Sequence, residues 1–154
     1  MLVKDIMTPA PRVCAPDTNL AAAAELMLDG DCGILPVVEE GKLVGVVTDR
    51  DMYIALATRD RRASELSVGE VTRQDVLLTC EPDDDIREAL ETMKTHRVRR
   101  LPVQGFGGTV IGMVSLNDIA LTAGPRKAIR SDDYLVTVQA ICAHHHPVPH
   151  VTAA

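Results

Sequence analysis

Two short stretches of the chain combine a hydroxyl residue with an aspartate three positions later. Thr48 is followed by Asp51, and Ser115 is followed by Asp118. This spacing is typical of a capping box, in which hydroxyl and carboxylate accept hydrogen bonds from backbone amides at the start of a helix. The same carboxylate can instead accept two hydrogen bonds from the vicinal diol of a ribose. A glycine precedes both pairs by three residues and permits close approach to the backbone, so the duplicated pattern favours binding over capping alone.

A second group of chemically active side chains is basic. The segment 96–103, H-R-V-R-R-L-P-V, is the only dense basic cluster in a chain of net charge −6. Arg97, Arg99 and Arg100 present forked donors that suit phosphate oxygens. The alternative is a solvated surface on which these arginines pair with nearby acids, because charge runs commonly lie on surfaces. Both interpretations remain open from the sequence.

The C-terminus carries the candidate metal ligands Cys142, His144 and His146. Thiolate and imidazole groups bind borderline metals such as zinc. The spacing matches no ordered four-ligand site, and adjacent histidines on a tail also bind metals adventitiously. The sequence therefore leaves metal binding as an alternative. Cys14 and Cys80 are predicted to be small buried apolar residues, which is the usual place of a free cysteine.

Composition restricts the classes of function. The excess of acids, 22 Asp and Glu against 16 Lys and Arg, argues against a general nucleic-acid binder. With 2 Tyr, 1 Phe and no Trp, the chain also lacks platforms for stacking single-stranded bases. No recognised catalytic motif is present, which predicts a non-enzymatic protein with no required cofactor. No segment predicts a signal peptide or a membrane span, so we expect a cytoplasmic, thiol-reduced protein without a membrane partner.

The elements that carry these residues occur twice. Four blocks of sequence recur at offsets of 65 to 67 residues, and the offset changes only in predicted loops. The paired blocks are 3–7 with 68–72, 17–27 with 83–93, 35–37 with 101–103, and 45–51 with 112–118. Such agreement indicates a duplicated structural unit.

Each unit has the order β-α-β-β-α. Apolar residues at helical spacing predict one helix from Leu20 and another from Ile86. Strands rich in Val and Ile are predicted to follow, with a second helix opening at Thr48 or Ser115. The predicted strands are 34–38 and 42–47 in the first unit, and 101–104 and 109–114 in the second. The fold class is therefore α/β (α+β), with two units packed face to face about a pseudo-twofold axis.

The predicted organisation has five parts. They are repeat 1 (1–58), a linker (59–66), repeat 2 (67–123), an extension (124–143) and a His-rich tail (144–154). A helix over 132–143 is predicted within the extension, capped by Ser131. Its apolar face could cover its own chain or meet a second chain.

In their order and duplication the motifs resemble a tandem pair of CBS domains, the Bateman module, over residues 1–123. The shared features are the V-x-D-I-M-T-like openings, the L-P-V strands and the closing G-h-x-[ST]-x-x-D motifs. The resemblance implies a stand-alone, bacterial-type regulatory protein that binds AMP, ADP, ATP or another adenosine compound in two related clefts. It also implies a homodimer that signals to an unidentified effector protein.

Site residues follow from the same resemblance. Thr48, Asp51 and Arg100 would line one cleft together with backbone around Val76 and Leu77. The other cleft would combine Ser115 and Asp118 with the segment that contains Thr8, Arg12 and Val13. At an offset of 66, Arg100 replaces Ile34, so the Asp51 cleft is expected to prefer phosphorylated ligands. A ligand-free dimeric interaction or stress-related scaffold remains the alternative to nucleotide binding.

Overall fold

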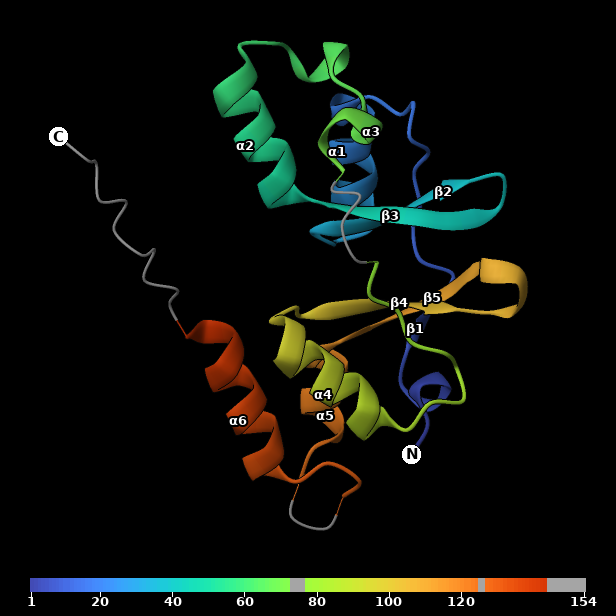
Figure 1. Ribbon diagram of the computed structural model, residues 1–154, viewed down its shortest axis with the longest axis vertical. Coiled ribbons are helices and arrows are strands. Elements are labelled where there is room, and N and C mark those ends of the chain that lie inside the picture. The colour runs from blue at the N-terminus through green and yellow to red at the C-terminus, as the bar shows by residue number, and fades with distance from the viewer. Residues whose placement is uncertain (73–76, 125–126, 144–154) are drawn as a thin grey trace, which may run out of the picture.

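The protein consists of two similar halves that lie one above the other in Figure 1, in a computed structural model that describes residues 1–72, 77–124 and 127–143. In each half a β-hairpin faces the other half, and helices cover its outer side. This arrangement confirms the predicted α+β class with two repeats. The first half contains α1 (Leu20–Asp29), β2 (Ile34–Glu39), β3 (Lys42–Thr48) and α2 (Asp49–Arg59), and the second contains α4 (Ile86–His96), β4 (Arg100–Gln104), β5 (Val110–Ser115) and α5 (Leu116–Thr122).

The first helix of each half begins at a capping residue. The side chain of Asn19 accepts a hydrogen bond from the Ala22 amide at 2.9 Å, and Asp85 accepts one from the Arg87 amide at 2.9 Å. These contacts satisfy amides that the helix itself cannot pair. The predicted apolar face of α4 is buried, namely Ile86, Ala89, Leu90 and Met93. In α1 the prediction is only partly correct: Leu20, Ala23 and Met27 are buried, whereas Ala24 and Leu28, predicted on the same face, are exposed.

The two hairpins share one register. Ile34 lies opposite Thr48 in the first hairpin, and Arg100 lies opposite Ser115 in the second. Both hairpins also shift register after the valine of the L-P-V segment, at Val37 and at Val103. The repeat found in the sequence is therefore a repeat of hydrogen-bond geometry, and the residue beside each capping hydroxyl is Ile34 or Arg100.

The N-terminal segment of each repeat packs against the half that the other repeat forms. Strand β1 (Thr8–Pro9) pairs antiparallel with β5, so the N-terminal segment lies beside the second half in Figure 1. A Cβ on Gly112 would lie 2.5 Å from Met7 Sδ, and a Cβ on Gly45 would lie 2.5 Å from Thr72 Cγ2. A side chain at either position would have to displace the side chain of the crossing segment, so glycine is the residue that fits without rearrangement.

Each hydrophobic core includes residues from a crossing segment. Val3, in the short helix η1 (Val3–Asp5), is fully buried among the second half's residues. Conversely, Leu66 and Val68 are buried in the first half's core, the latter in α3 (Val68–Val71). The remaining short elements are η2 (Ala63–Glu65) and η3 (Phe106–Gly108). Neither half therefore has a complete core made only from its own repeat.

The last helix, α6 (Ser131–Cys142), covers its own chain. It packs against α4, and its Tyr134, Val138 and Ile141 lie on the second core. Its start departs from the prediction, since Arg130 is the residue at the cap and no side chain accepts a capping hydrogen bond there. Ser131 is the first helical residue instead. None of the helices among the described residues is long and apolar enough to cross a bilayer.

Candidate functional site

Both hydroxyl–aspartate pairs form the predicted capping boxes. Thr48 Oγ1 donates to Asp51 Oδ2 at 2.6 Å, and Ser115 Oγ donates to Asp118 Oδ2 at 2.6 Å. In each pair the aspartate amide donates back to the hydroxyl. A carboxylate has about four acceptor sites, so capping a helix leaves room for hydrogen bonds from a ligand. The capping interpretation is therefore correct, and it does not exclude binding.

Asp51 lines a cleft of about 600 Å³ between the two halves. Four predicted residues meet there, namely Thr48, Asp51, Leu77 and Arg100. Val76 lies outside the described residues. Residues of β3 and the start of α2 form one wall, and residues 97–100 and Pro102 of the second half form the other. The volume suits a ligand of nucleotide size.

Asp118 lines a smaller cavity of about 260 Å³. Of the predicted residues, Thr8, Arg12, Ser115 and Asp118 line it, and Arg100 reaches it as well. Val13 is exposed and lies outside this lining, where Pro11 is found instead. The crossing of the N-terminal segment onto β5 explains why Thr8 and Ser115 are neighbours despite their separation in the sequence.

Charge differs sharply between the two cavities. The described lining of the Asp51 cleft has four arginines and two aspartates, whereas that of the Asp118 cavity has two of each. The difference arises at matching positions. Arg97 ends α4 with φ +56°, and Asp31, its counterpart at an offset of 66, has φ +45° just after α1. The same backbone turn therefore presents a cation to one cavity and an anion to the other.

Two charged residues of the Asp51 cleft were not predicted. Asp49 and Arg50 lie between Thr48 and Asp51 and both line the cleft. The side chain of Asp49 also approaches the backbone at Gly33, where a Cβ would lie 2.7 Å from its Oδ2. A comparison of the two repeats could have identified them, because the matching residues of the second repeat, Leu116 and Asn117, are uncharged.

Burial accounts for the protonation state of Cys14 and Cys80, two free cysteines at matching positions of the repeats. Each thiol, Cys14 and Cys80, lies 3.8 Å from the carbonyl of the proline in the neighbouring strand. Desolvation raises the pKa of Cys14 to about 11. Desolvation, with the charge of Asp84 adding to it, raises the pKa of Cys80 to about 12. Both thiols are therefore protonated at neutral pH, as expected for core residues.

The tail candidates for metal binding are only partly described. Cys142 is exposed at the end of α6, while His144 and His146 lie outside the described residues. Within residues 1–72, 77–124 and 127–143, no group of three His, Cys, Asp or Glu side chains could hold a metal ion. The metal interpretation stays a prediction.

Two pseudo-symmetric halves with cavities at their junction define a duplicated ligand-binding module. The CBS domain family matches residues 3–58 and 68–122, which confirms the resemblance inferred from the motifs. The CBS domain-containing protein YhcV of Bacillus subtilis is 34% identical over 119 residues, or 77% of this chain and 83% of that protein. The chain belongs to the CBS domain family.

Solved structures agree with this assignment. The CBS domain pair of protein MJ0100, in complex with 5′-methylthioadenosine and S-adenosyl-L-methionine, has a TM-score of 0.70 and 28% identity, covering 79% of this chain and 94% of that one. CBSX2 in complex with AMP has a TM-score of 0.67 and 27% identity, covering 78% and 93%. Relatives of similar length and fold are thus known with adenosine compounds bound.

Proposed function

We propose that this protein is a non-enzymatic regulatory module that binds a phosphorylated adenosine compound in the Asp51 cleft. One observation carries the proposal: Asp51 and Arg100, from different repeats, line a single cavity of about 600 Å³. A carboxylate suits the two hydroxyls of a ribose, and arginines suit a phosphate group. The adenosine ligands of MJ0100 and CBSX2 support the ligand class.

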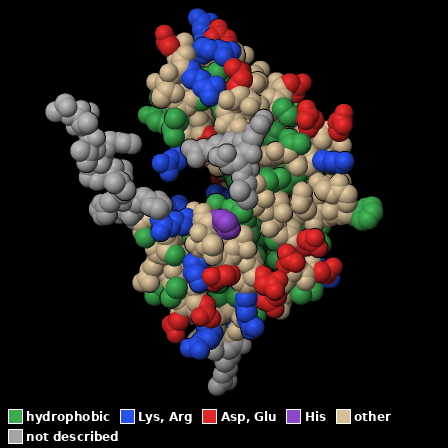
Figure 2. Space-filling view, viewed as in Figure 1, with side chains coloured by type: hydrophobic (Ala, Val, Ile, Leu, Met, Phe, Trp, Pro, Cys, Tyr) green, Lys and Arg blue, Asp and Glu red, His purple; other side chains and the backbone are tan. Residues whose placement is uncertain are grey.

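The remaining lining of the cleft fits the base of such a ligand. Val44, Val46, Leu77 and Leu78 provide apolar surface on both sides of the cavity. Flat aromatic ligands bind in pockets that are mostly apolar and have a few convergent polar groups. In Figure 2, Lys and Arg side chains border the hollow between the two halves, which favours an anionic ligand.

The Asp118 cavity is proposed to bind phosphorylated ligands weakly or not at all. Its volume of about 260 Å³ is small for a nucleotide, and Asp31 lies in its wall where the other cleft has Arg97. An aspartate next to a phosphate repels it. A less charged adenosine compound is the ligand that this cavity would accept.

A titration of thermal stability tests the proposal. A ligand that binds only the folded protein raises the midpoint of unfolding as its concentration increases. We expect AMP, ADP or ATP to raise the midpoint with one dominant site by calorimetry, and adenosine without phosphate to have a smaller effect. If no adenosine compound changes the midpoint, the proposal is wrong and the ligand-free scaffold becomes the better interpretation.

We also propose that the protein forms a homodimer through its first half. A groove of about 570 Å³ between α1 and α2 is lined by Met27, Leu28, Tyr53 and Leu56. Leu28 is 81% exposed and Tyr53 is 72% exposed. The second half has Lys94 and Ala120 at the positions that match Leu28 and Tyr53, and α6 packs there on α4. The apolar groove, which no described segment of the chain covers, is therefore best explained by a second copy of the chain.

The effector protein, the cytoplasmic location and the exact nucleotide stay predictions from the sequence. A ligand that joins the two halves would change their relative position or that of two chains. An effector would then read this change, because allosteric coupling requires a ligand that binds two states differently.

A further inference from the structure

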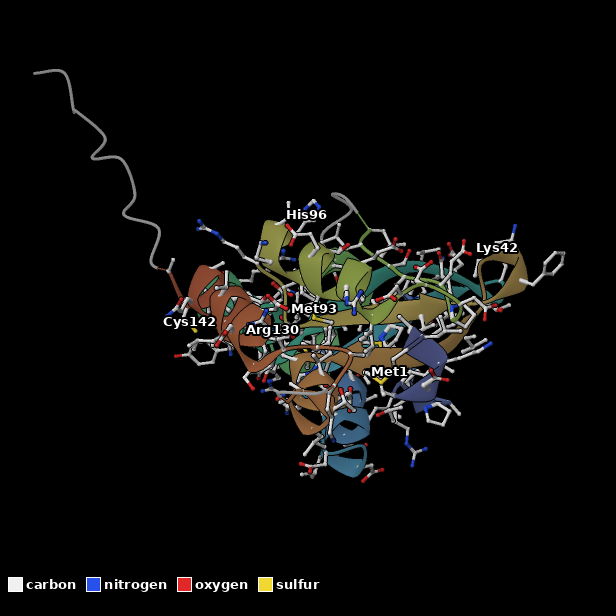
Figure 3. All side chains as sticks on the ribbon, turned by 90° about the horizontal axis from the view of Figure 1, so that it is seen from below. Met1, Lys42, Met93, His96, Arg130 and Cys142 are labelled. Carbon is white, nitrogen blue, oxygen red and sulfur yellow. The ribbon has the colours of Figure 1, made fainter. Side chains whose placement is uncertain are left out.

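A separate cavity of about 440 Å³ lies where α6 covers the second half. One wall consists of Arg99, Arg100 and the start of α5, and the other is the inner face of α6 from Tyr134 to Cys142. Figure 3 shows Cys142 at the far end of α6, at the opposite end of the molecule from Lys42. The α6 wall lies outside the two repeats, so this cavity is a feature of the extension. We refer to it as the α6 cavity.

The lining of the α6 cavity is suited to an anion. Hydrogen-bond donors are present on Arg99, Arg100, Asn117 and Tyr134, and no Asp or Glu is among its described lining residues. Within the described part of the chain, no carboxylate forms an ion pair with Arg99 or Arg100, whereas Arg61 is paired with Glu70 at 2.8 Å. Two arginines that face a cavity without a counter-charge favour an anionic ligand.

The α6 cavity adjoins the Asp51 cleft. Arg99, Arg100 and Ile141 line both. An anion in the α6 cavity would therefore contact the same two guanidinium groups that are proposed to bind the phosphate of a nucleotide in the cleft. A chain of phosphates that extends from the cleft past these arginines would enter the α6 cavity.

We propose that the α6 cavity is the subsite for the second and third phosphates of a nucleotide whose adenosine lies in the Asp51 cleft. This inference rests on the proposed function and makes the protein selective for the number of phosphates. Helix α6 then contacts the part of the ligand that distinguishes a nucleoside triphosphate from a monophosphate. A free diphosphate ion has the same chemistry and is the other possible source of the anion.

The test compares two variants that each add one carboxylate near the end of α6. Cys142→Asp places the charge in the wall of the α6 cavity, while Ala143→Asp places it one residue further on, outside that wall. Both positions are exposed, so neither variant disturbs the core. Cys142→Ser serves as the control for loss of the thiol. AMP, ADP and ATP are titrated into each full-length protein by calorimetry.

We expect the unmodified protein to bind ATP roughly tenfold more tightly than AMP, because phosphate oxygens gain charge-assisted hydrogen bonds. Cys142→Asp removes this preference by repulsion and leaves AMP binding unchanged, whereas Ala143→Asp and Cys142→Ser retain it. Pyrophosphate competes with ATP more strongly than with AMP, because AMP shares only Arg99 and Arg100 with it, whereas ATP also occupies the α6 cavity. If pyrophosphate instead binds together with ATP, the anion does not come from the nucleotide, and the proposal is overturned.

Two further outcomes separate this inference from the proposed function. Equal affinity for AMP and ATP, or equal losses in the two aspartate variants, overturns the subsite and leaves the Asp51 cleft as a nucleotide site. If AMP, ADP and ATP all fail to bind, the proposed function is wrong, and the subsite is overturned with it.

Discussion

Replacing Asp51 by Asn is the most direct test of how the cleft would bind a ribose. The Asp51 carboxylate accepts hydrogen bonds from the Thr48 hydroxyl at 2.6 Å and from the Thr48 amide at 3.3 Å. Asparagine has nearly the same size and retains a carbonyl acceptor, so the helix cap largely persists. The substitution removes the negative charge that would strengthen two hydrogen bonds from a ribose diol.

The expected loss follows from the strengths of the two kinds of hydrogen bond. Hydrogen bonds to charged groups contribute about 1.5–3 kcal/mol, against about 0.5–1.5 kcal/mol for neutral ones. Two such bonds give a difference of about 2–3 kcal/mol, which is roughly 30- to 150-fold in the dissociation constant. Calorimetric titration of the nucleotide measures this change, and thermal unfolding without ligand measures any loss of stability.

The repeat supplies a matched control for this experiment. Asp118→Asn makes the same change in the same capping box, where Ser115 donates to Asp118 at 2.6 Å. We expect it to leave affinity in the Asp51 cleft unchanged. Wild-type affinity in the Asp51→Asn protein, or an equal loss in both variants, would refute the assignment of the ribose to Asp51.

Three further predictions concern assembly, pH and thiol reactivity. Leu28→Glu should convert the dimer to a monomer, as measured by light scattering. Leu121→Glu, at an equally exposed site of the second half, should leave the dimer intact. Dissociation of both variants would contradict dimerisation through the first half. Hydrogen bonds from Ser67 and Arg61 lower the pKa of Glu70 to about 2 from an ordinary 4.5, so its contribution to stability is present above pH 4.5 and is lost as the pH falls towards 2. Glu70→Gln should accordingly lower the unfolding temperature at pH 7, with no difference near pH 2; a constant difference across this range would be inconsistent with the shift. Mass-resolved alkylation should modify Cys142 first and the buried Cys14 only on unfolding, and early modification of Cys14 would show that its core opens.

The repeat in the sequence predicted much of the fold. Because the offset of 66 preserves both apolar periodicity and hairpin register, the sequence alone identifies Ile34 and Arg100 as counterparts. Each strand extends one residue beyond one of its predicted ends, since hydrogen-bond ladders continue past the apolar core, and β5 begins one residue later than predicted. The capping boxes were also predictable, because they depend only on residues three positions apart.

Features that depend on long-range packing were harder to predict from the sequence. The pairing of β1 with β5 could not be read from periodicity, since a strand of two residues, Thr8–Pro9, has no pattern. The partner of α6 stays open in the sequence because its apolar spacing fits any apolar surface. Thr8, Arg12 and Val13 were expected at the Asp118 cavity, and Pro11 lies there in place of Val13, because the lining depends on how the crossing segment turns.

The burial of Val3 in the second half and of Val68 in the first has a consequence for how such a molecule arose. A chain carrying one unit alone would have a gap in its interior and an opening segment with no place to dock. Two separate chains could fill both gaps only by exchanging these N-terminal segments. Joining the units in one polypeptide makes this exchange of segments intramolecular, so its free energy no longer depends on protein concentration.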